Sequence, residues 1–167
     1  MHTWFECKVR YDRLDENGLP KKVTEPYLVD ALSFTEAEAR ISKEMQPYIS
    51  GEFIIASIKK ANISELFENP SGDRWFRCRV NFIIVDMEKG TEKKVASNMY
   101  VQANDIKEAL ENLTKGLQGT MSDYSVASIT ETMILDVYPY VAPANIVSKE
   151  QPDMAYSVAV TAETEEE

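Results

Sequence analysis

Apolar and polar residues alternate near the start of the chain. Phe5, Cys7 and Val9 are separated by Glu6 and Lys8, and a period of two is typical of a strand with one buried face. The pattern predicts a strand over about Trp4–Leu14. Similar patterns predict longer strands at about 21–31, 53–61, 75–87, 93–103 and 124–132, and short ones at about 63–67 and 134–138.

Two segments have the helical spacing instead. Apolar residues recur every three or four positions at Phe34, Ala37, Ile41 and Met45, and Pro47 ends the pattern. Either Ser33 with Glu36 or Thr35 with Glu38 could form the capping box at the start of this helix. A second helix is predicted after Asn104 or Asp105, with these residues on its buried side: Ile106, Ala109, Leu110, Leu113 and Leu117.

The two halves of the chain repeat one pattern. Trp4–Val9 recurs 71 residues later as Trp75–Val80, and the tripeptide Ala56-Ser57-Ile58 recurs as Ala127-Ser128-Ile129. Such self-similarity indicates two copies of one supersecondary unit. We therefore predict an α+β fold with an internally duplicated ββαβ unit, over about 4–67 and 75–138. Two helices would pack on one face of antiparallel sheet, and one continuous sheet and two sheets both satisfy the pattern.

Composition separates a body from a tail. The 167 residues carry a formal net charge of −10, and residues 141–167 contain Lys149 against six carboxylates. We predict one domain over 1–140 and an acidic, largely flexible tail over 141–167. The charge disfavours wholesale nucleic-acid binding. The sequence has no apolar run long enough for a membrane span and no signal-peptide pattern, so we expect a cytoplasmic protein.

Residues for common catalytic chemistry are scarce. The single histidine is His2, and the glycines form no phosphate-binding loop motif. Cys7 and Cys78 occupy equivalent repeat positions without CxxC spacing, so we predict buried free thiols rather than a disulfide or redox pair. The acidic residues of the first predicted turn are most simply solvated charges. We expect no catalytic residues, no metal site and no cofactor, and hence no enzyme activity.

One strand face in each half carries the candidate binding residues. On the side opposite the predicted core lie Trp4, Lys8 and Arg10 in the first half, and Trp75, Arg77 and Arg79 in the second. An aromatic ring beside cations can stack on a base and pair with phosphates. Alternatively, the cations pair with carboxylates on neighbouring strands, and the tryptophans fill the boundary between the halves.

Several segments resemble a known family. Trp4–Tyr11, Lys21–Arg40 and Asp136–Tyr140 look like a domain family of unknown function found in Bacteroidetes and their phages, and the match covers about 1–140. The resemblance implies a bacterial or phage cytosolic protein, but it brings no activity or catalytic residues.

Two binding functions remain open at this point. We expect a non-catalytic module that binds a protein partner or assembles with itself, through its symmetric body and exposed strand edges. The alternative is a module that binds a nucleotide, single-stranded nucleic acid or another phosphate-bearing ligand on the Trp/Arg face.

Overall fold

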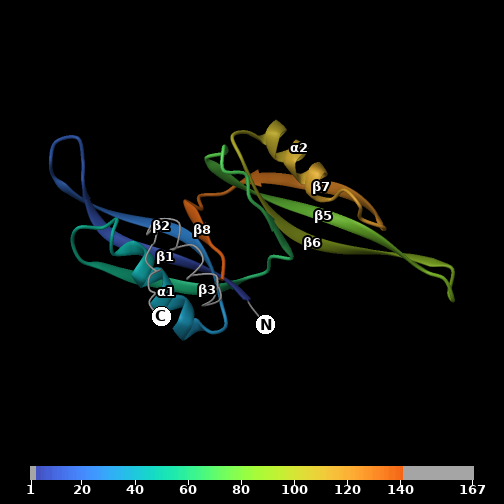
Figure 1. Ribbon diagram of the computed structural model, residues 1–167, viewed down its shortest axis with the longest axis horizontal. Helices are drawn as coiled ribbons and strands as arrows, with labels where there is room; N and C mark the ends of the chain where they lie inside the picture. The colour runs from blue at the N-terminus through green and yellow to red at the C-terminus, as the bar shows by residue number, and fades with distance from the viewer. Residues whose placement is uncertain (1–2, 141–167) are drawn as a thin grey trace, which may run out of the picture.

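The architecture is known from a computed structural model, which describes residues 3–140 (Figure 1). His2 and the expected tail over 141–167 lie outside the described residues. The elements, in chain order, are β1 (Thr3–Leu14), β2 (Pro20–Ala31), α1 (Phe34–Met45), β3 (Phe53–Ala61), β4 (Glu65–Phe67), β5 (Arg74–Asp86), β6 (Thr91–Ala103), α2 (Ile106–Gly116), β7 (Asp123–Glu131) and β8 (Asp136–Tyr138).

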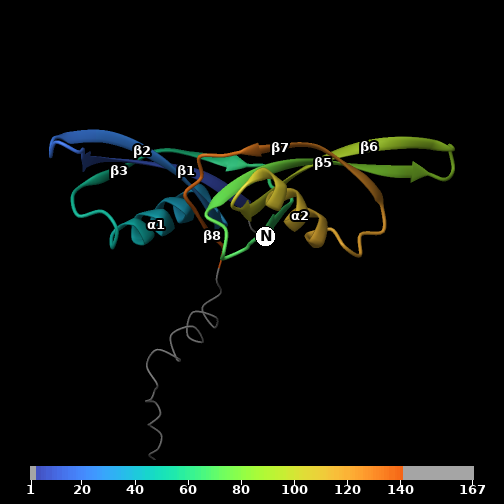
Figure 2. The same ribbon diagram turned by 90° about the horizontal axis from the view of Figure 1, so that it is seen from above.

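The strands form two sheets of four, with orders β3-β1-β2-β8 and β4-β6-β5-β7. Each sheet has one helix packed against it, and both helices lie on the same side of the molecule (Figure 2). The predicted α+β fold with a duplicated ββαβ unit is therefore confirmed, and the choice between one sheet and two is resolved in favour of two. Neither helix within residues 3–140 has the length and apolar content needed to cross a membrane.

Local sequence signals explain the hairpins and the helix starts. Gly18 and Gly90 adopt positive φ angles of 79° and 66° in the turns after β1 and β5, a conformation that favours glycine. Ser33 and Asp105 cap the two helices by accepting hydrogen bonds from the amides three residues later. A glutamate in each first turn accepts from the amide just before the cap, so Ser33–Glu36 is the pair used.

The two halves exchange their last short strands. β4 follows the first unit along the chain but pairs in parallel with β6 of the second unit. β8 follows the second unit and pairs in parallel with β2 of the first. The exchanged strands make each sheet mixed, whereas the longer strands pair antiparallel. In Figure 1, β8 lies beside β2 in the first half of the molecule, whereas most of β7, which precedes it in the sequence, lies in the second half.

Each helix covers its own small core. In the first half, Phe5, Cys7 and Val9 of β1 pack with Ala37, Ile41 and Met45 of α1. The second half repeats this with Phe76, Cys78 and Val80 of β5 against Ala109 and Leu113 of α2. Both cysteines are fully buried free thiols in equivalent places, as predicted.

A third cluster joins the halves on the side away from the helices. We call it the central cluster; its buried members are Leu28, Trp75, Tyr100, Ile134 and Val137, with Trp4, Ala61, Ile63 and Leu66 packed against them. It draws on both halves and on both exchanged strands. Burial of this apolar area stabilises the contact between the two sheets.

Candidate functional site

The sheet faces opposite the helices carry unpaired cations; we call this surface the open face. Lys8 lies between Pro26 and Ser57 in the strand register, and Arg10 between Thr24 and Ile54. In the second half, Arg77 lies between Tyr100 and Thr130, and Arg79 between Asn98 and Ser128. Every cross-strand neighbour of these four cations is uncharged, so the expected alternative of cross-strand pairing with carboxylates does not describe them.

The ion pairs formed within residues 3–140 use other cations. They join Arg13 to Glu25, Lys22 to Asp12, and Arg74 to Asp73 and Glu131. Of the four open-face cations, Arg10 has one weak side-chain partner, since its Nε lies 3.4 Å from Thr24 Oγ1. A charge without an ion pair stays available to a ligand from outside.

Two of the predicted cations meet at a shallow pocket between the halves; we call it the seam pocket. Its volume is about 290 Å³. Its lining comprises Glu6, Lys8 and Pro26 from the first half, and Arg77, Tyr100, Glu131, Thr132, Met133 and Ile134 from the second. Arg10 and Arg79 share the open face but do not line this pocket.

The two tryptophans are not free stacking platforms. Trp75 is 3% exposed within the central cluster, so its ring has no face available to a base. Trp4 is half-buried and packs against the same cluster. Their positions fit the alternative in which the tryptophans fill the boundary between the halves.

Tyr100 is a pocket residue that sequence reasoning missed. The residue is 7% exposed, but its hydroxyl oxygen is not itself buried. Thr132, by contrast, already donates its hydroxyl to the Trp75 carbonyl at 2.8 Å and accepts from the Ile134 amide. The second strands of the two halves are offset by 72 residues, which aligns Tyr100 with Leu28; the tyrosine hydroxyl beside Arg77 is the signal that the sequence offers.

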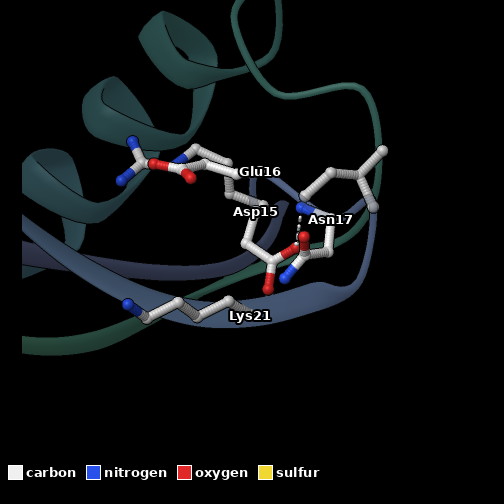
Figure 3. Close-up of a pocket in the computed structure, with 6 residues that line it drawn as sticks. Asp15, Glu16, Asn17 and Lys21 are labelled. Atoms are coloured by element: carbon white, nitrogen blue, oxygen red, sulfur yellow. Dashed lines mark hydrogen bonds between the residues drawn. The ribbon is translucent and has the colours of Figure 1, made fainter.

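Another hollow, of about 500 Å³, lies at the tip of the β1–β2 hairpin (Figure 3). Asp15 and Glu16 line it, but Asp15 Oδ1 already accepts from the amides of Asn17 and Leu19 at 2.9 Å. This carboxylate stabilises the turn. Among residues 3–140, no group of three or more His, Cys, Asp or Glu side chains is arranged to hold a metal ion.

The thiols lie in apolar surroundings. Burial, with a smaller contribution from the nearby Glu6 carboxylate, raises the pKa of Cys7 to about 12. Burial raises the pKa of Cys78 to about 11. Thiolate is the reactive form of cysteine, so these environments disfavour nucleophilic chemistry at both residues.

Comparison with known proteins identifies the family but supplies no activity. No curated protein matches the chain. A family model described as a domain of unknown function, DUF4494, matches residues 3–140, which is most of the sequence. The chain therefore belongs to the DUF4494 family.

Proposed function

We propose that this protein is a non-catalytic interaction module that binds an acidic protein partner across its open face. The observation that carries the proposal is the set of cations Lys8, Arg10, Arg77 and Arg79, all with uncharged cross-strand neighbours. Charge complementarity between surfaces steers association and selects partners. Consistent with the sequence resemblance, we place this binding in the cytoplasm of a bacterium of the Bacteroidetes or of a phage-infected cell.

The open face supports this role better than the sheet edges do. The outer strands β3 and β7 each contain a bulge at equivalent places, where Ala56 and Ala127 have no register partner. Bulges interrupt the hydrogen-bonding edge and hinder the addition of another strand. A second copy of the chain would present the same cations, so pairing of two open faces would be repulsive. An acidic partner of different sequence is therefore the better match.

Paired charge reversals on opposite sides of the molecule test this proposal. The test variant carries Arg10→Glu and Arg79→Glu, both outside the seam pocket. The control carries Lys43→Glu and Lys107→Glu, which are exposed on the helices and change the net charge equally. Each tagged protein is used to recover partners from cells that express the gene, and bound proteins are quantified by mass spectrometry at low and moderate salt.

We expect an acidic protein that the wild type and the helix-side control retain, that the open-face variant loses, and that moderate salt releases. Loss of the partner from both variants, or retention by both, would contradict binding through the open face. Recovery of no specific partner by the wild type would also contradict the proposal.

The phosphate-ligand alternative is favoured by a separate observation, the meeting of Lys8 and Arg77 at the seam pocket. The seam pocket is therefore the candidate site for such a ligand.

A further inference from the structure

We infer that the seam pocket binds a small phosphomonoester, a ligand class distinct from the proposed protein partner. The pocket is near the lower limit of volumes typical of small-molecule sites. It is formed by both halves and bordered by the buried central cluster. Its size suits one small molecule or one unit of a larger one.

Cations from different halves supply the charge for a phosphate. Arg77 offers a planar fork of donors that matches two phosphate oxygens, and Lys8 adds a compact positive charge. Neither cation forms an ion pair within residues 3–140. Glu6 and Glu131 line the same hollow, so its lining carries no net charge; a dianionic phosphate would contact Lys8 and Arg77, and the rest of the ligand would face the carboxylates.

The hydroxyl of Tyr100 adds a hydrogen-bond donor at the pocket beside the two cations. Most of the residue is buried, but its hydroxyl oxygen is not. The hydroxyl is therefore accessible from the pocket and can donate to a ligand there. A phosphate oxygen held by Arg77, its neighbour across the strand pair, would accept from this hydroxyl.

The carboxylates narrow the choice of ligand. Glu131 is already paired with Arg74 at 3.8 Å, whereas Glu6 forms no ion pair within residues 3–140. The Glu6 carboxylate is partly exposed; beside the phosphate position it favours a ligand that also carries a hydrogen-bond donor, because phosphate alone would be repelled. Sugar phosphates and nucleoside monophosphates carry hydroxyl or amino donors near their phosphate. Since Trp75 is buried, recognition would not depend on stacking against its ring.

Titration of the full chain with matched ligands tests this inference. The probes are ribose 5-phosphate and AMP, with ribose, adenosine and glutamate as controls that lack a phosphate. Binding is followed by ligand-observed NMR and by backbone amide shifts. We expect the two phosphate esters to bind with shifts at the seam pocket, and the three control ligands not to bind there.

The variants distinguish the seam pocket from general attraction to the open face. Tyr100→Phe keeps the ring and every charge, and we expect it to weaken binding about tenfold, because a hydrogen bond to a charged group is lost. Arg77→Gln should weaken binding further, whereas Arg79→Gln, on the same face but outside the pocket, should change it less than about twofold.

Equal affinity of wild type, Tyr100→Phe and Arg77→Gln would overturn the inference. So would a lack of binding by both phosphate esters at millimolar concentration, or binding of glutamate as tight as theirs. Failure of phosphate binding can be told apart from failure of protein binding. The variant with Arg10→Glu and Arg79→Glu leaves the lining of the seam pocket intact, and Tyr100→Phe leaves the charge of the open face intact.

Discussion

At the scale of single residues, alternation predicted which side chains face the helices and which face away. It placed Phe5, Cys7 and Val9 inside and Lys8 and Arg10 outside, and the structure agrees. Alternation does not show what covers the outer side. Trp75 was expected on an exposed face and is buried, because the other half of the molecule packs over it. Burial by a distant segment leaves no mark in the local pattern.

The buried thiols make stability depend on pH in the alkaline range. Their pKa values are raised from an ordinary value of 9.0, so the unfolded chain loses these protons first. The contribution of the protonated thiols to the free energy of unfolding is full below pH 9. It decreases as the pH rises toward 11 to 12, because the unfolded chain is then increasingly deprotonated. We expect the free energy of unfolding to fall by about 2–3 kcal/mol between pH 8 and pH 10, measured with urea under reducing conditions.

The double variant Cys7→Ala with Cys78→Ala serves as the control. It should be less stable at pH 8, because two core side chains are shortened, but its stability should change less between pH 8 and pH 10. Tyr27 and Tyr138 also have pKa values raised by burial, and they act in the same direction at higher pH. A wild-type stability that is level from pH 8 to pH 10 would show that the thiols are not buried as described.

At the scale of elements, the longer strands and both helices could be predicted because each has a clear period or cap. The short strands could not be assigned to a sheet. Glu65–Phe67 and Asp136–Tyr138 span three residues each, too few for a period to show a partner. Their exchange is set by packing, since Leu66 joins the central cluster and Phe67 the core under α2.

The segment between the repeats is held closely against the end of β6. The backbone N–H of Asn69 donates to Gln102 Oε1 at 2.9 Å, and Gln102 Nε2 donates to the Gly72 carbonyl at 3.0 Å. At Gly72, an added Cβ would lie 2.7 Å from the backbone of Ala103. Such a contact is too short for any side chain, and backbone atoms cannot move aside easily.

We therefore expect Gly72→Ala to lower the free energy of unfolding by about 1–3 kcal/mol through overpacking. Gly51→Ala is the matched control, because nothing lies within 4 Å of a Cβ built there; it should be neutral or slightly stabilising. Thermal or urea unfolding of the two variants provides the comparison. Equal stability of both would mean that the segment between the repeats does not approach β6 as described.

At the scale of the whole molecule, duplication and strand exchange together create the seam pocket. Lys8 belongs to the first half and Arg77 to the second, and they line one hollow because the halves meet on the open face. The β1–β2 and β5–β6 hairpins extend to opposite ends of the molecule (Figure 1). Sequence repeats predicted the two units, but they did not show how the units contact one another. Because this contact joins the two halves, we predict that residues 1–140 fold as one domain.

Through the exchange of short strands, each half of the molecule completes the sheet of the other. Inter-strand NOEs measured on the whole chain test this exchange. We predict NOEs between Leu66 and Tyr100 and between Val137 and Leu28, the residues that the parallel registers place opposite each other. NOEs joining Leu66 to Leu28 and Val137 to Tyr100 instead would show that each short strand stays in its own unit, and would contradict the exchange and the seam built on it.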